Sequence, residues 1–268
     1  MFHELLIKDI RATTGFIERN FNLIKRYIGW EIVFMVYTIV NAVTIGLIGV
    51  TSGDPNKVVY LIIGALLWGF LSIIFHEVAE SISWERWEGT IEFTFMAPAR
   101  RITYLLGMST YAVIYALIRS AIVLFFLSLF FEIKLTNINI PIAVLVVVVS
   151  SFSFIGMGLI AAVFPLLSPE KGSQATHIFQ AIILLISGVY YPISVLPGWM
   201  QKLAIISPAT YTLRAVRAAI LDGKGLNELS GDIIILIILG IILIPIGLII
   251  FSMGERYAKK VGKLNRNG

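Results

Sequence analysis

The hydrophobic pattern divides the chain into one amphipathic segment followed by long apolar segments. In the amphipathic segment, residues 1–27, large apolar side chains recur every three, four or seven positions, at Leu6, Ile10, Ile17, Phe21 and Ile24. Charged residues fall mostly between these positions. One apolar face at the helical period predicts a helix that lies in a membrane interface. The alternative is an ordinary helix that docks on a soluble partner.

Segments long enough to cross a membrane follow at once. A helix needs about 20 apolar residues to cross a bilayer. The chain offers six such segments, at 28–50, 58–81, 104–131, 140–167, 174–193 and 233–251. Turn-forming residues at 51–56 and 168–172 separate neighbouring segments. The sequence therefore predicts an all-α integral membrane protein with six transmembrane helices.

The region from the end of the fifth segment onward is less regular. Pro192 and Pro197 interrupt the apolar sequence, and Pro208 interrupts it again. Proline lacks a backbone donor and breaks helices, so residues 194–229 are expected to form pieces too short to be ordinary spans. Their apolar character suits segments that dip partway into the bilayer. The alternative is an external loop packed on the bundle.

Composition agrees with a membrane protein. Of 268 residues, 58% are hydrophobic and 14% are charged, and the mean hydropathy is +0.90. Six spans leave almost no chain for a soluble catalytic domain, so residues 1–268 are expected to form a single transmembrane domain. The net charge of +5 comes from basic residues in loops and in the tail, residues 252–268. The positive-inside rule accounts for them without nucleic acid.

The distribution of Lys and Arg predicts the orientation. With the N-terminus inside, most basic residues fall in cytoplasmic segments, and few, such as Lys57 and Lys134, fall outside. An even number of spans brings both ends to the same side, so both termini are predicted to be cytoplasmic. Residues 1–26 contain acids and lack a continuous apolar core, which excludes a cleavable signal peptide in that stretch.

Motifs for covalent or nucleotide chemistry do not occur in the sequence. It has no Gly-x-x-x-x-Gly-Lys-Ser/Thr loop for phosphates, no Gly-x-Ser-x-Gly, no His-Glu-x-x-His and no cysteine. His3, His76 and His177 show no spacing that fits a zinc or haem site. We therefore expect no catalytic residue and no metal site in this chain.

Ionisable residues in the predicted spans bear on transport. Secondary transport needs acids near the middle of the membrane, whereas Glu31, Glu77 and Glu80 are predicted at span ends, which weakens a secondary transporter or channel as the alternative. Arg119 lies inside the third span, about 22 Å from Tyr104 at 1.5 Å per residue. A base inside a span is a candidate for the translocation path; otherwise its guanidinium reaches the outer headgroups.

Two motifs carry a family resemblance. The connector at 84–98 contains Glu85, Arg86, Trp87, Glu88, Gly89, Thr90, Ile91 and Glu92, followed by Pro98. The second motif runs Ser187-Gly-Val-Tyr-Tyr-Pro-Ile-Ser-Val-Leu-Pro-Gly-Trp-Met200, followed by Ser207-Pro-Ala-Thr-Tyr211 and Arg217. The sequence resembles the permease subunits of type-2 ABC exporters, and the resemblance covers nearly the whole chain. It rests on these two motifs, on their order, on the number of residues and on the number of spans.

The resemblance implies that the residues from Glu85 to Glu92 form a cytoplasmic coupling helix that contacts a separate ATP-binding subunit. Gly89 permits a sharp start to such a helix, and Thr90 supplies a cap. Glu85, Glu88 and Glu92 are three and four residues apart, so we expect them on one helix face, where they would pair with basic groups of the ATPase. The alternative is a solvated acidic connector with its tryptophans anchored at the interface.

The resemblance also implies an external gate, partners and a location. The second motif would form a re-entrant external helical hairpin that places Tyr190, Tyr191, Pro192, Pro197 and Trp199 at the translocation path or its external gate. The chain would pair with a second copy or a paralogous permease in the plasma (inner) membrane of a prokaryote, in contact with lipid. ATP and Mg would bind to the partner ATPase, with no cofactor in this chain.

The family that the sequence resembles contains exporters of two substrate classes. The hairpin is somewhat closer to exporters of amphipathic drugs or lipids than to exporters of lipid-linked polysaccharides or teichoic-acid-like polymers. Tyr190, Tyr191 and Trp199 could also serve as platforms for sugars. We expect an amphipathic small molecule or lipid as the substrate, with the polymer as the alternative.

Overall fold

The computed structural model describes residues 2–96, 100–131, 138–168 and 171–262, with the backbone alone described at 2–6, 92, 95 and 101. Every regular element in these ranges is helical. In chain order they are α1 (Phe2–Arg26), α2 (Ile28–Val50), α3 (Pro55–Trp87), α4 (Ile91–Met96), α5 (Arg101–Phe130), α6 (Ile140–Ala161), α7 (Val163–Leu167), α8 (Gly172–Ile186), the 3₁₀ turn η1 (Ile193–Val195), α9 (Gly198–Ala204), α10 (Pro208–Leu221) and α11 (Leu226–Val261).

Five described segments are long and apolar enough to cross a membrane: α2, α3, α5, α6 together with α7, and α11. The predicted fifth span, 174–193, is instead the 15-residue helix α8. At 1.5 Å per residue α8 is about 22 Å long, which is less than the ~30 Å of a bilayer core. It ends before Gly188, whose left-handed backbone (φ +68°) does not continue a helix. The chain is a multi-pass membrane protein, with five candidate spans in its described part.

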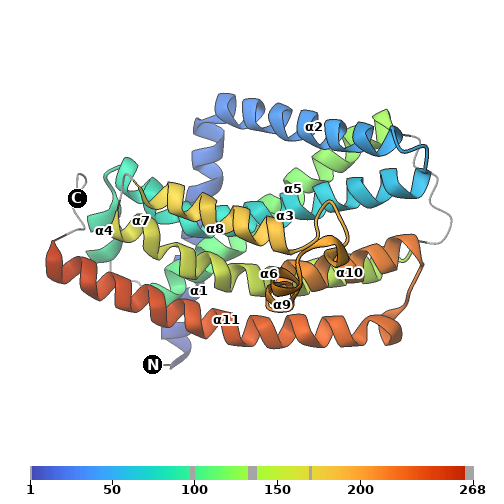
Figure 1. Ribbon diagram of the computed structural model, residues 1–268. Coiled ribbons are helices and arrows are strands. Elements are labelled where there is room, and N and C mark those ends of the chain that lie inside the picture. The colour runs from blue at the N-terminus through green and yellow to red at the C-terminus, as the bar shows by residue number, and fades with distance from the viewer. Residues whose placement is uncertain (1, 97–99, 132–137, 169–170, 263–268) are drawn as a thin grey trace.

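The long helices lie side by side, and α1 runs across them (Figure 1). The most extensive contact joins α6 and α11. A Cβ at Gly156 of α6 would lie 2.6 Å from the carbonyl carbon of Leu243, and one at Gly247 of α11 would lie 2.7 Å from the carbonyl oxygen of Gly156. Glycine at these positions lets the two backbones approach closely, as is typical of helix pairs in membranes.

The helix α1 packs on α5 through aromatic side chains. Ring centroids lie 5.1 Å apart for Phe16 and Tyr104 and 5.2 Å apart for Phe21 and Tyr111, both edge to face. Ile10, which belongs to the predicted apolar face, stays exposed. The amphipathic pattern thus predicted the helix, and part of its apolar face packs against another helix.

Two helices extend beyond their predicted ends. The helix α3 passes the predicted end at residue 81 and continues to Trp87, and α11 runs from Leu226 through Pro245 to Val261. Hydropathy located only the apolar middle of each helix, whereas tertiary packing extends the helix into polar sequence, where Glu255 is buried. The predicted hairpin at 194–229 therefore overlaps the start of α11, and the predicted tail at 252–268 begins as helix.

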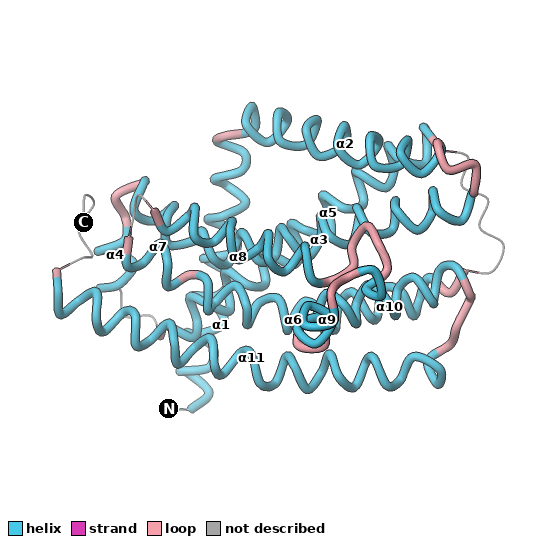
Figure 2. Tube along the Cα trace, in the orientation of Figure 1, coloured by secondary structure: helices cyan, strands magenta, loops and turns pink. Residues whose placement is uncertain are grey.

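A break in the helical path lies between α8 and α10, part-way along the bundle (Figure 2). η1 and α9 occupy this break, and the hydroxyl oxygens of Ser187 and Ser207 lie 2.7 Å apart across it. Most residues of α10 are buried against α6, α11 and α3. The part of the predicted external hairpin that forms α10 is therefore packed into the bundle, whereas η1 and α9 are mostly exposed, with Trp199 at the surface.

The guanidinium of Arg217, on α10, holds this break in place. It is almost completely buried and donates to the carbonyl oxygens of Gly188 (3.0 Å), Val189 and Tyr60 (3.3 Å). It also lies 3.5 Å from the centroid of the Tyr60 ring. Gly64 of α3 provides the room, because a Cβ there would lie 2.2 Å from the carbonyl oxygen of Val189 and 2.8 Å from the guanidinium.

Replacing Gly64 by Ala should lower the free energy of unfolding by about 1–3 kcal/mol, because the methyl group collides with a backbone carbonyl. The control is Gly69→Ala on the same helix, where a Cβ meets nothing within 4 Å. That change should leave stability unchanged or raise it by up to about 1 kcal/mol. Thermal unfolding of both variants in detergent measures the difference, and equal midpoints would contradict the packing at Gly64.

Candidate functional site

The residues from Glu85 to Glu92, called here the coupling motif, comprise the end of one helix, a turn and the start of the next helix. The helix α3 ends at Trp87, and α4 begins at Ile91. Between them Gly89 has φ +71°, a left-handed conformation that favours glycine. The predicted coupling helix thus begins at Ile91, and the prediction that Glu85, Glu88 and Glu92 share one face of a single helix was wrong, because Gly89 ends the first helix.

Of the two motif acids whose side chains the structure describes, Glu85 is the more buried, with 2% of its surface exposed. Its carboxylate pairs with the guanidinium of Arg19 on α1 and accepts hydrogen bonds from the hydroxyls of Thr90 (2.6 Å) and Thr94 (2.8 Å). The expectation that Glu85 faces an ATPase is therefore not met in this conformation. Through these contacts the Glu85 carboxylate instead links the end of α3 to α1 and to α4.

The charge of Glu85 also affects its partner. Burial by itself lowers the pKa of Arg19, but the hydrogen bond and the charge of Glu85 outweigh burial and raise that pKa above its ordinary value. Arg19 additionally donates to the Thr90 hydroxyl at 3.2 Å. The sequence analysis assigned no role to Arg19, and its position off the apolar stripe of α1 was the only signal.

The other residues of the motif divide into buried and exposed positions. Arg86 is almost completely buried and donates to the carbonyl oxygen of Leu166 at 2.7 Å, which ties α3 to the end of α7. Ile91 is buried as well, whereas Trp87 is 60% exposed. The side chain of Glu92 and all of Pro98 lie outside the described part of the structure.

Glu88 is the described acid of the motif that reaches the surface. Its carboxylate accepts a hydrogen bond from the Tyr27 hydroxyl (2.9 Å) and lies 3.9 Å from the Arg26 guanidinium. The hydrogen bond to Glu88 raises the pKa of Tyr27. The Tyr27 ring contacts the rings of Trp84 and Trp87, both exposed. The junction between α1 and α2 therefore rests on the coupling motif.

A groove separates α1 from the coupling motif. It has a volume of about 600 Å³, and Glu18, Arg19, Arg26 and Glu88 supply its charged lining. Its lining thus contains two acids and two bases, and Thr90, just before α4, lines it as well. We call this feature the groove.

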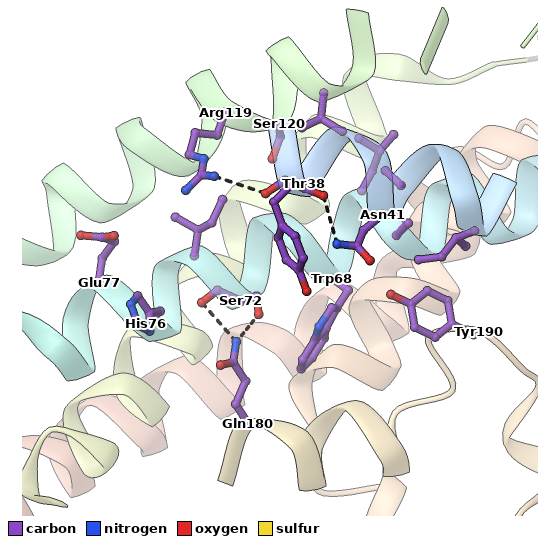
Figure 3. A pocket seen from close by; sticks show the side chains of 18 residues that line it. Thr38, Asn41, Trp68, Ser72, His76, Glu77, Arg119, Ser120, Gln180 and Tyr190 are labelled. Atoms are coloured by element: carbon purple, nitrogen blue, oxygen red, sulfur yellow. Dashed lines mark hydrogen bonds between the residues drawn. The ribbon is translucent and has the colours of Figure 1, made fainter. Parts of the chain in front are cut away.

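Arg119 lines a central cavity of about 400 Å³ (Figure 3). Its guanidinium donates to the hydroxyl oxygens of Tyr115 (3.1 Å) and Thr38 (3.3 Å). The Tyr115 hydroxyl in turn donates to Glu31 of α2. The guanidinium is thus held by α2 and α5 inside the bundle, which differs from the alternative of a side chain that reaches outer headgroups.

The central cavity lies among α2, α3, α5 and α8. Trp68, Ser72 and Glu77 line it from α3, and Gln180 lines it from α8. Glu77 lies ten residues before Trp87, the last residue of α3, which is about 15 Å along the helix. The helix thus continues well past the predicted end of the span at residue 81, and the position of Glu77 near the end of its span stays a prediction.

Of the predicted gate residues, Tyr190 lines the central cavity with Arg119. Tyr191, Pro192, Pro197 and Trp199 do not line it: Tyr191 donates from its hydroxyl to the carbonyl oxygen of Leu185, and Trp199 is 65% exposed. The structure thus brings together two residues that are distant in sequence and leaves the rest of the hairpin outside the cavity.

The histidines lie closer together than their spacing in the sequence indicates. The ring centroids of His76 on α3 and His177 on α8 are 5.5 Å apart. Even so, the described residues contain no group of three or more His, Cys, Asp or Glu that could hold a metal ion. We assign no metal chemistry to this pair.

Comparison with known families matches residues 15–221 to the ABC-2 type transporter family. The matched range contains the coupling motif, Arg119, Tyr190 and the whole of α10. A search of curated proteins finds no match. Members of this family are membrane components of ABC transporters, which work with an ATP-binding partner. The match covers most of the chain, and the chain therefore belongs to the ABC-2 type transporter family.

Proposed function

We propose that this chain is the membrane-spanning half of an ATP-driven exporter that moves an amphipathic small molecule or lipid outward. The observation that carries the proposal is the central cavity, where aromatic Trp68 and Tyr190 and charged Glu77 and Arg119 line one space. Apolar walls with a few convergent polar groups are typical of sites for such molecules.

The size of the cavity favours a small substrate over a polymer. Pockets for small molecules have volumes of about 300–1,000 Å³, and the central cavity, about 400 Å³, falls within this range. A lipid-linked polysaccharide or teichoic-acid-like polymer needs a path that is open along the length of the polymer. The polymer is therefore the less favoured substrate.

The contacts of the coupling motif would transmit a movement of the ATPase to the central cavity. A displacement of α4 would act on Thr90 and Thr94, and through Glu85 on both α3 and α1. The helix α3 continues without a break from the motif to the cavity-lining Glu77. ATP binding would thus switch the bundle between conformations, and movement of segments rather than covalent chemistry would carry the substrate.

The groove is the surface that we assign to the ATPase. It is lined by Glu88 and Thr90 of the coupling motif, and its two acids and two bases offer partners for a charged helix of the ATP-binding subunit. A second copy of the chain, or a paralogous permease, would complete the translocation path. We further propose that α8, too short to span alone, continues through the break into α10 and that α9 enters the bilayer from outside as a re-entrant hairpin.

The purified chain alone should neither bind nor hydrolyse ATP, because its sequence has no phosphate-binding loop. Titration with a fluorescent ATP analogue measures binding, and phosphate release measures hydrolysis. Both activities should appear only when the ATP-binding subunit is added. A micromolar Kd for the chain by itself would contradict the proposed division of labour.

Cysteines introduced at Asp54 and Lys224 should react with an impermeant maleimide in intact cells. Cysteines at Lys171 and Lys260 should react only after permeabilisation, because the charge distribution places both termini in the cytoplasm. The first pair and the second pair lie at loops or helix ends, so the substitutions leave the helices intact. Labelling in the reverse pattern would invert the proposed orientation.

Replacing Glu85 by Gln should uncouple ATP hydrolysis from transport while the ATPase still co-purifies. The change leaves Arg19 without its ion pair at a cost of about 1–3 kcal/mol, so the tie between α1 and α4 is weakened. Replacing Glu88 by Gln should instead weaken co-purification, because Glu88 lines the groove. Substrate-stimulated ATP hydrolysis in proteoliposomes measures coupling, and wild-type coupling in the Glu85 variant would remove the proposed role of this carboxylate.

A further inference from the structure

Three hollows follow one another through the described part of the bundle. A small pocket of about 70 Å³ lies between the groove and the central cavity. The groove and this pocket share Arg19, Leu23 and Glu88 as lining residues, and the pocket and the central cavity share Glu77. The shared linings place the three hollows next to one another, in a series called here the route, and Glu77 lines both the small pocket and the central cavity.

Carboxylates outnumber bases along this route. The small pocket is lined by Glu31, Glu77, Glu85 and Glu88 and by one base, Arg19. Arg19 pairs with Glu85, and Arg26 at the groove lies close to Glu88. The carboxylates of Glu31 and Glu77 form no ion pair among the described residues.

Arg119 is the only guanidinium that lines the central cavity in the described part of the chain. Its guanidinium reaches Glu31 through Tyr115, which donates to Glu31 and accepts from Arg119, and its charge also acts on Glu77 without forming an ion pair with it. Glu77 is hydrogen-bonded to Tyr111 and, among the described residues, forms no ion pair. No described ion pair therefore offsets the charge of Glu77, and an unpaired charge is costly in an apolar bundle.

Aromatic rings stand on both sides of Glu77. Tyr111, which lines the small pocket, stacks on Tyr115 with ring centroids 5.6 Å apart, and Trp68 and Tyr190 line the central cavity (Figure 3). The faces of such rings attract cations and also pack against apolar groups. A proton or a metal ion would make no use of the rings, and a neutral molecule would not offset the charge.

We infer that the central cavity binds lipophilic organic cations, with the positive group beside Glu77, and that they reach it along the route past the coupling motif. The inference rests on the proposed export function, for which it names the class of substrate. An organic anion fits less well, because Arg119 is already engaged by Tyr115 and Thr38 and an anion would also meet Glu77.

Tetraphenylphosphonium and tetraphenylborate test the inference, because the two ions have nearly the same shape and opposite charges. The measurement is binding of each ion to the purified chain in lipid nanodiscs, with uptake by empty nanodiscs subtracted. The cation should bind saturably, and the anion should show no saturable binding. Saturable binding of the anion with equal or higher affinity, or no saturable binding of the cation, would overturn the inference.

Substitutions test whether Glu77 is the carboxylate that binds the cation. Glu77→Gln should weaken binding of the cation at least about tenfold, whereas Glu77→Asp should keep most of the affinity. Asp222→Asn removes a carboxylate that is exposed in the loop between α10 and α11, and it should bind as the wild type does. Arg119→Gln removes the opposing charge and should bind the cation at least as tightly as the wild type. Unchanged affinity in a folded Glu77→Gln protein, or weaker binding in Arg119→Gln, would refute the assignment.

Binding to the isolated chain needs no ATPase, so the inference and the proposed function can fail separately. If the cation binds through Glu77 but ATP does not drive its movement in vesicles that contain the ATPase, the site stands and the export function is wrong. If ATP drives transport of another molecule and the cation does not bind, export stands and the inference falls.

Discussion

A single buried carboxylate, that of Glu85, holds together the part of the molecule nearest the coupling motif. A charge with almost no exposed surface is stable only when other groups satisfy it. Arg19 supplies the opposite charge, and Thr90 and Thr94 supply hydrogen bonds. These partners lie on α1, at the turn and on α4, so the need to satisfy one charge fixes where α1 crosses the bundle and where α4 begins. Gly89 makes the turn that brings the threonines back to the carboxylate.

A buried charge also stabilises the break between α8 and α10, but here the charge is positive. A helix that ends inside an apolar bundle leaves carbonyl oxygens without partners. The buried guanidinium of Arg217 donates to two carbonyl oxygens just beyond the end of α8, at Gly188 and Val189, and to the carbonyl oxygen of Tyr60 on α3. At this break a buried base thus donates to carbonyl oxygens, whereas at the coupling motif a buried acid accepts hydrogen bonds from hydroxyl groups.

The central cavity lies between these two anchored regions. Its walls come from α2, α3, α5 and α8, and α3 is the element that reaches from Glu85 at one end to Gly64, beside Arg217, at the other. A movement of the coupling motif would thus be transmitted along one continuous helix. The chain of contacts from Arg119 through Tyr115 to Glu31 links α5 to α2 across the same space, so the cavity can change shape only if these contacts move together.

The local pattern of residues was enough to predict the helical class, the amphipathic α1, most of the apolar segments and the two motifs. These features depend on neighbours along the chain, and the match over residues 15–221 supports the resemblance that they carried. The ends of α3 and α11 were missed because hydropathy measures apolar character and does not register the packing that extends a helix into polar sequence.

Only the tertiary structure decided which charged residues are buried. Glu85 and Glu88 belong to the same motif, yet one is enclosed by α1 and the other reaches the groove, because Arg19 lies beside the first. Likewise, Arg119 and Tyr190 are far apart in sequence and line one cavity. The sequence by itself determined where helices form, since helix formation follows the local order of side chains. Which charges meet was decided by the fold, because the pairing of buried groups depends on their distance in space.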